Sequence, residues 1–255
     1  MAFCTKCGKE VADGEVCSCQ ATKAAPVNVD VAGEAGNIIG NAMDIVGDPE
    51  GGVARFLAGI SWAKVVVLTA IYAILDVIYG LWYKIKANID YKNMLEDSAD
   101  DLDMDLDEYM DWLDIDSASR YGAGDIVKGI FMDILGVAAA VAVTALVFWL
   151  AFKFIKKTQI TWQKAFGIAV IDFLIAIPLF VVYHVLDFVP DFKLWAWILS
   201  AISAVNIWGQ KIITYLAVRS ECEDTKSAVY VAVPSIAAIS LLTSFVSFIL
   251  TSLLN

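Results

Sequence analysis

Residues 134–154 read ILGVAAAVAVTALVFWLAFKF, an apolar run with a single charged side chain at Lys153. A helix needs about 20 largely apolar residues to cross the roughly 30 Å of hydrocarbon in a bilayer, and this run is long enough. Because 59% of the 255 residues are hydrophobic, we predict an all-α integral membrane protein with a transmembrane domain over 62–255. Five transmembrane helices are predicted in it, at 65–83, 134–154, 166–185, 194–213 and 229–253.

The distribution of lysine and arginine predicts how these helices are oriented. If the N-terminus lies in the cytosol, the inner segments carry twelve Lys and Arg residues and the outer segments carry six. Cytoplasmic loops of membrane proteins are enriched in these two residues. We therefore expect a protein of the cytoplasmic membrane, with its N-terminus in the cytosol and its C-terminus outside.

Four cysteines lie within the first nineteen residues, in the pattern Cys4-x2-Cys7 and Cys17-x-Cys19. Two thiolate pairs about ten residues apart can complete a tetrahedron around one Zn²⁺ ion. Such a site is structural, because four sulfur ligands leave no open position for a catalytic water. The pattern predicts a zinc ribbon over 1–20, held in the reducing cytosol; a redox role of the cysteine pairs is the alternative.

Two further segments separate this ribbon from the first predicted span. Residues 21–36 are small and polar and contain Pro26, which predicts a flexible linker. Apolar residues in 37–61 recur at roughly helical spacing around the break Gly47-Asp48-Pro49. This pattern indicates one or two amphipathic helices in the membrane interface.

The outer loop 84–128 contains a strongly acidic stretch, with eleven Asp and Glu residues in 96–116. The alternation of Asp with apolar residues suggests calcium binding, but the stretch fails the EF-hand pattern: from Asp101, position six is Leu106 and position twelve is Trp112, where glycine and glutamate are required. A solvated acidic segment remains the simplest interpretation. It is either disordered or an acidic amphipathic helix.

Several polar side chains fall inside the predicted spans, and ionisable groups at that depth usually face a bundle interior or a water-filled path. Asp76 and Asp172 are the residues that a transporter would use, with His184 and Asn206 as further members of an intramembrane polar site. The alternative is that both carboxyl groups form hydrogen bonds that hold helices together. We expect the second role more than the first.

The composition also argues against several classes of function. We find no nucleophile elbow, phosphate loop or metalloprotease pair, and a single histidine rules out most acid–base triads, so no catalytic residues are expected. The net charge of -11 does not favour nucleic-acid binding. Cys222 lies among acidic residues that disfavour its thiolate. Small residues in the spans allow close packing within one chain or between chains, so a homo-oligomer is one alternative.

The segment from Asp48-Pro49 to Phe56, the five spans and the inner loop before the last span together resemble the Yip-type family of membrane proteins. The most similar part runs from Trp208-Gly-Gln-Lys through the loop to Pro234. Eukaryotic members of this family are linked to vesicle traffic and small GTPases. Nothing in this sequence identifies a GTPase partner.

The N-terminal sequence FCTKCGKE, from Phe3 to Glu10, resembles the short zinc ribbons that are fused to small bacterial membrane proteins. The second cysteine pair departs from their pattern, because Cys17-Ser18-Cys19-Gln20 replaces C-x2-C-G. We therefore expect a scaffold or adaptor whose ribbon docks an unknown cytosolic protein while the bundle anchors or organises the membrane. The alternative is a small transporter or channel subunit that uses Asp76 and Asp172.

Overall fold

The computed structural model describes residues 2–3, 10–11, 31–115, 117, 119–187 and 193–254. Two short strands, β1 (Ala2–Phe3) and β2 (Glu10–Val11), pair antiparallel, with Ala2 opposite Val11. All other regular structure in the described residues is helical, which confirms the all-α class of the membrane domain. The predicted zinc ligands lie outside these residues; they are Cys4, Cys7, Cys17 and Cys19.

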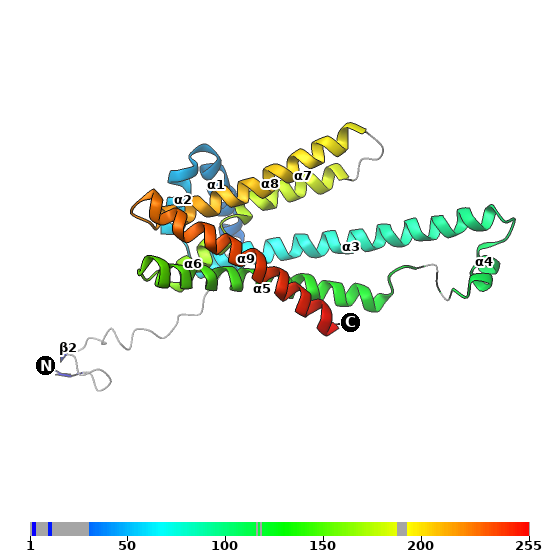
Figure 1. Ribbon diagram of the computed structural model, residues 1–255, viewed down its shortest axis with the longest axis horizontal. Coiled ribbons are helices and arrows are strands. Elements are labelled where there is room, and N and C mark those ends of the chain that lie inside the picture. Colours follow the sequence, from blue (N-terminus) through cyan, green and yellow to red (C-terminus); the bar gives the residue numbers. More distant parts are fainter. Residues whose placement is uncertain are drawn as a thin grey trace.

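The long helices pass back and forth along the longest axis of the molecule, and α7 and α8 form an arm that diverges from α3 and α5 (Figure 1). The connection between α6 and α7 is a turn at residues 171–172 inside the predicted third span. The helices are α1 (Val31–Gly47), α2 (Pro49–Ala58), α3 (Trp62–Asp100), α4 (Leu106–Leu113), α5 (Ala123–Ala151), the π-helix η1 (Phe152–Lys156), α6 (Trp162–Val170), α7 (Phe173–Asp187), α8 (Lys193–Ser220) and α9 (Thr225–Leu254).

Four helical segments are long and apolar enough to cross a membrane. They are Trp62–Asp100, Ala123–Lys156, Trp162–Leu186 and Thr225–Ser252, and they contain the first, second, third and fifth predicted spans. The predicted span 194–213 lies in α8, whose described residues do not reach the same apolar character. Asn206, Gln210 and Lys211 lower the apolar character of that helix, so the fifth crossing stays a prediction.

Helices α1 and α2 pack into one end of the bundle, where α2 contacts α6 and α8. Ile45, Val53, Phe56 and Leu57 are all almost fully buried there. Helix α1 ends at Gly47 and α2 begins at Pro49, and we call this junction the elbow. The sequence explains it, because the Asp48 carboxylate accepts a hydrogen bond from the Gly51 N–H at 3.1 Å and caps α2. The four buried apolar residues belong to one core, which continues into α3, α5, α6 and α8.

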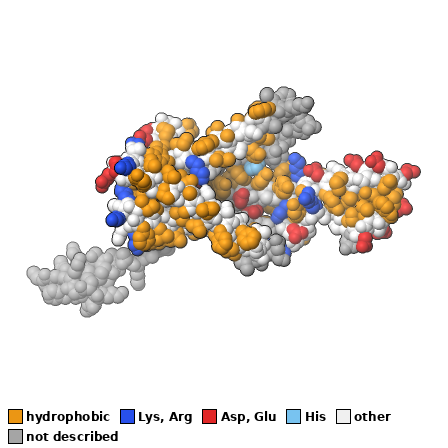
Figure 2. All heavy atoms as spheres, viewed as in Figure 1, with side chains coloured by type: hydrophobic (Ala, Val, Ile, Leu, Met, Phe, Trp, Pro, Cys, Tyr) orange, Lys and Arg blue, Asp and Glu red, His pale blue; other side chains and the backbone are white. Residues whose placement is uncertain are grey.

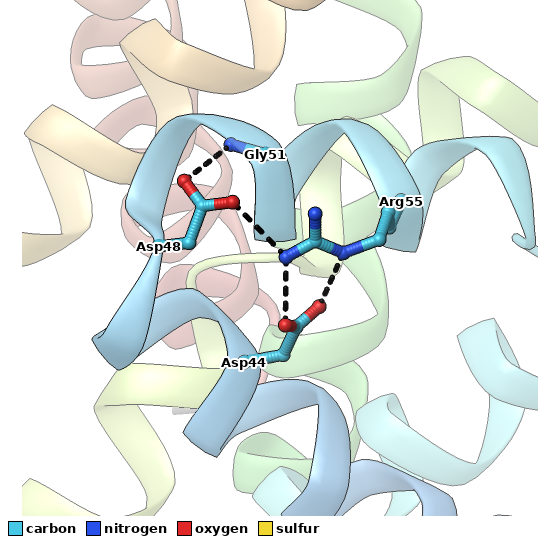
Figure 3. A network of polar contacts seen from close by, with 4 residues as sticks. All are labelled: Asp44, Asp48, Gly51 and Arg55. Carbon is cyan, nitrogen blue, oxygen red and sulfur yellow. Dashed lines mark hydrogen bonds and ion pairs between the residues drawn. The ribbon is translucent and has the colours of Figure 1, made fainter.

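The elbow is closed by Arg55, whose guanidinium group donates to the Asp44 carboxylate through Nε at 2.8 Å and through Nη2 at 2.7 Å (Figure 3). The same Nη2 donates to Asp48 Oδ2 at 3.1 Å. These hydrogen bonds lower the pKa of Asp44 and raise that of Arg55. The ion pairs are solvent-exposed, so they orient the elbow more than they stabilise it.

Helix α3 continues beyond the predicted end of the first span at residue 83 and ends at Asp100. The chain then reverses at Asp103, whose φ of 59° is left-handed, and α4 folds back against the end of α3. Leu95 and Ala99 are buried in this contact. The acidic loop thus contains an extended helix and a short second helix.

Candidate intramembrane polar site

Two adjoining cavities lie within the bundle. The larger has a volume of about 480 Å³ and is lined by α3, α5, α7 and α9, and the smaller, of about 260 Å³, reaches α8. Ala140, Phe173 and Thr243 line both cavities, so the two spaces are neighbours. Figure 2 shows a hollow in the middle of the molecule with acidic side chains in it.

Two carboxyl groups line the larger cavity, Asp76 from α3 and Asp133 from α5. The lining residues include no lysine, arginine or histidine. Asp133 reaches α3 at Gly80, where an added Cβ would lie 2.7 Å from Asp133 Oδ2. Gly80 therefore allows the carboxylate to pack against the backbone of α3, and a larger residue at that position would displace it.

Asp172 lies on the smaller cavity, at the interruption between α6 and α7. Its Oδ1 atom is buried and has no hydrogen-bond partner among the described residues. Lys211 from α8 lines the same cavity and interacts with Asp172 electrostatically. A buried carboxylate oxygen without a hydrogen bond lowers the stability of the fold, and a bound donor group would remove that cost.

The structure divides the predicted polar site into two parts. Asp76 and Asp172 line the adjoining cavities, whereas His184 and Asn206 line a separate pocket of about 170 Å³ between α7 and α8. His184 stacks on Tyr79, with ring centroids 3.7 Å apart. Asn206 Oδ1 accepts a hydrogen bond from Gln210 at 3.0 Å. These partners give both residues a packing role in the arm.

Asp133 is the site residue that the sequence analysis missed. It immediately precedes the predicted span 134–154 and lies outside both that span and the predicted outer loop 84–128. In the structure α5 begins at Ala123, so Asp133 lies inside a helix that is long enough to cross the membrane. The sequence feature that could have identified Asp133 is an acidic residue within an apolar stretch, since its neighbours are Ile130, Phe131, Met132 and Ile134.

The cysteines and the other side chains that could bind a metal ion do not form a site in the described residues. The four predicted zinc ligands lie outside the described residues, and within the described part of the chain no group of three His, Cys, Asp or Glu residues could hold a metal ion. Cys222 is half-buried near the start of α9. Burial and the neighbouring acidic groups raise the pKa of its thiol, which makes it a poor nucleophile.

A second surface of interest is the platform, which consists of α1, α2 and residues 157–161 and 221–224. Lys164 Nζ lies 2.7 Å from Glu221 Oε2, and Lys156 Nζ donates to the Glu221 carbonyl oxygen at 2.8 Å. Arg219 and Glu50 form a further ion pair at 3.3 Å. These contacts join α2 and the ends of α6, α8 and η1 into one unit.

Comparisons with family models, with curated proteins and with solved structures find no match to this chain. The resemblances to Yip-type proteins and to zinc ribbons therefore remain predictions from the sequence. The cavities and the platform are the structural features that bear on function.

Proposed function

We propose that this chain is a membrane adaptor without enzymatic activity. Its helical bundle anchors it in the cytoplasmic membrane, and its N-terminal zinc ribbon docks a cytosolic protein. The observation that carries the proposal is the platform, since α1 starts at Val31 and joins the N-terminal segment to a well-packed end of the bundle. A Yip-type relationship, with a fifth crossing in α8, forms part of the same proposal.

The charges on the platform end support a cytosolic orientation. Lys64, Lys153, Lys156 and Lys164 all lie at or near this end, and Arg219 lies at the end of α8 beside it. Basic residues next to membrane helices favour the cytosolic side. The ribbon, the platform and the docked protein would then share one compartment.

The adaptor function is tested by affinity purification of the full chain in a mild detergent, followed by mass spectrometry and measurement of bound zinc. The test variant is Cys4→Ser/Cys7→Ser, and the matched control is Cys222→Ser, which removes a thiol outside the predicted ribbon. We expect the test variant to lose both the zinc and the partner, and the control to keep both. A partner that survives the loss of zinc would contradict docking by the ribbon.

The adjoining cavities favour a second candidate function, a small transporter or channel subunit that uses Asp76 and Asp172. Carboxyl groups within a bundle are a common means of moving cations or protons. The Asp76→Asn/Asp172→Asn double variant separates the two functions. It should keep the partner of an adaptor, whereas it should abolish solute movement in vesicles if the protein is a transporter.

A further inference from the structure

We propose that the larger cavity is a binding site for an organic cation, held by Asp76 and Asp133. This proposal goes beyond the adaptor function and gives the second candidate a substrate class. It concerns binding alone, so it can be tested without a partner protein and without transport.

The wall of the larger cavity carries two acidic side chains. Asp76 and Asp133 come from two different helices and line one space, with no basic side chain among the lining residues. Asp76 also lies within the first predicted span, where an ionised group is costly unless it has a partner. Lys84 from α3 already interacts electrostatically with Asp133, whereas the charged neighbour of Asp76 is Asp133 itself. A bound cation would supply the missing partner for Asp76 and a second one for Asp133.

The size and lining of the larger cavity favour an organic cation over a metal ion. A volume of about 480 Å³ is in the range of small-molecule pockets, and it is far larger than a metal ion requires. No group of three metal-ligating side chains occurs in the described residues. Met132, Val137 and Leu250 supply apolar wall instead. The cavity therefore suits a ligand with an apolar body and one positive charge.

A stacked pair of aromatic rings belongs to the same wall. Tyr72 and Phe173 are stacked, with ring centroids 4.3 Å apart and planes 3° from parallel, and both line the larger cavity. An aromatic face attracts a cation, and the attraction is stronger where water is excluded. The Tyr72 hydroxyl group also lies near both Asp76 and Asp172. Aromatic and acidic groups are thus combined around one space.

An independent observation comes from the smaller cavity. Asp172 Oδ1 is buried there without a hydrogen-bond partner, and Phe173 and Thr243 belong to both cavities. A buried carboxylate oxygen lacks a donor, which an N–H group of a bound ammonium ion would supply. Lys211 lines this smaller cavity too and interacts with Asp172 electrostatically, so only the larger cavity has acidic lining residues without a basic one.

Gly136 offers a way to close the larger cavity without changing its charge. It lines this cavity on α5, and an added Cβ would meet no atom within 4 Å. A leucine at this position would extend into the open space. Gly124 is the matched control, because it lies on the same helix, is equally free of neighbours within 4 Å and does not line the cavity.

The experiment measures ethidium binding to the purified full chain in phosphatidylcholine nanodiscs, by fluorescence anisotropy. Tetraphenylphosphonium serves as a cationic competitor and triphenylphosphine oxide as a neutral one. The variants are Asp76→Asn, Asp133→Asn and Gly136→Leu, with Gly124→Leu and Asp97→Asn as controls. Asp97 is an exposed acidic residue on α3 outside the predicted span.

We expect saturable binding that the phosphonium ion displaces and the phosphine oxide does not. Each loss of a carboxylate should weaken binding about tenfold or more, the usual range for a hydrogen bond to a charged group. Gly136→Leu should abolish binding, and both controls should bind as the wild type does. The proposal is overturned if the wild type binds neither cation, if the neutral competitor is equally effective, or if a folded Gly136→Leu variant still binds ethidium.

Discussion

Acidic side chains on the platform form ion pairs, whereas the residues that line the larger cavity include acidic side chains and no basic one. On the platform, Glu221 lies against Lys164 and the Asp44 carboxylate against Arg55. In the cavity, two carboxyl groups line one wall without a basic side chain among the lining residues. Charges that are paired within the chain can contribute to folding, whereas Asp76, which lies beside another carboxyl group, adds a cost that a ligand can offset. In the proposed cation site, Asp76 would serve binding, whereas the paired charges of the platform hold the structure.

The largest expected effect tests whether the platform is a folded core. Phe56 is 2% exposed between α2 and the bundle, and Phe56→Ala should lower the free energy of unfolding by about 3–5 kcal/mol. Phe245→Ala is the matched control, since Phe245 is 59% exposed on α9 and should cost about 0.5 kcal/mol or less. Thermal unfolding in detergent, followed by tryptophan fluorescence, measures both. Equal losses would show that α2 does not depend on this core.

A somewhat smaller effect is expected at the elbow, where α1 and α2 approach each other closely. An added Cβ on Gly52 would lie 2.8 Å from the Asp44 carbonyl oxygen and from the Ile45 backbone. Gly52→Ala should therefore cost about 1–3 kcal/mol, because neither backbone segment can easily move away.

The control for this variant is Gly40→Ala on α1, where an added Cβ meets nothing within 4 Å. Alanine is the better helix former, so this change should stabilise the protein by about 0.5–1 kcal/mol. The same thermal unfolding assay compares the two variants. A Gly52→Ala variant that is as stable as Gly40→Ala would contradict the close approach.

The sequence predicts the transmembrane part well where apolar length alone decides. Four of the predicted spans coincide with helices that can cross a membrane. The end of α3 was harder to predict, because Lys84 and Lys86 mark the end of the apolar run but not the end of the helix. No glycine or proline follows before Asp100, so nothing in the backbone stops the helix.

The candidate site was only half predictable from the sequence. Asp76 and Asp172 are recognisable because they interrupt apolar runs. The contact of Asp133 with α3 depends on Gly80, and nothing in the sequence pairs these two positions. The separation of His184 from the cavities depends in turn on how the α7–α8 arm diverges, which is a property of the packed bundle.

Neutralising one carboxylate in each region should sharpen the comparison. Glu221→Gln removes an ion pair whose side chains are 38% (Lys164) and 16% (Glu221) exposed, so it should cost about 1 kcal/mol after allowance for solvent screening. Asp76→Asn removes a charge from the cavity wall and should leave the unfolding temperature unchanged or raise it. Both are measured by thermal unfolding without added ligand. The distinction between the two regions fails if Asp76→Asn is the more destabilising change.

The smallest expected effect is the pH dependence of the elbow. The hydrogen bonds from Arg55 lower the pKa of Asp44, so the folded-state pKa lies below the unfolded value of about 4. The stability that Asp44 contributes is therefore present above about pH 4 and is lost as the pH falls through the folded-state pKa. Asp44→Asn should flatten the fall in unfolding temperature between about pH 4 and pH 2.

The residual slope in the Asp44→Asn variant has an identifiable source. Hydrogen bonds from Ser227 lower the pKa of Asp224, which caps α9 on the same platform, so its contribution is lost over a similar pH range. The Asp44→Asn/Asp224→Asn double variant should therefore have a flatter profile than either single variant. The measurement is the unfolding temperature of each variant between pH 2 and pH 6. An Asp44→Asn profile identical to that of the wild type would show that the Asp44–Arg55 contact does not contribute to the acid dependence. Both carboxylates lie on the platform and neither lines the larger cavity. An acid-dependent loss of stability that vanishes in the double variant would therefore be assigned to Asp44 and Asp224 and not to the cavity.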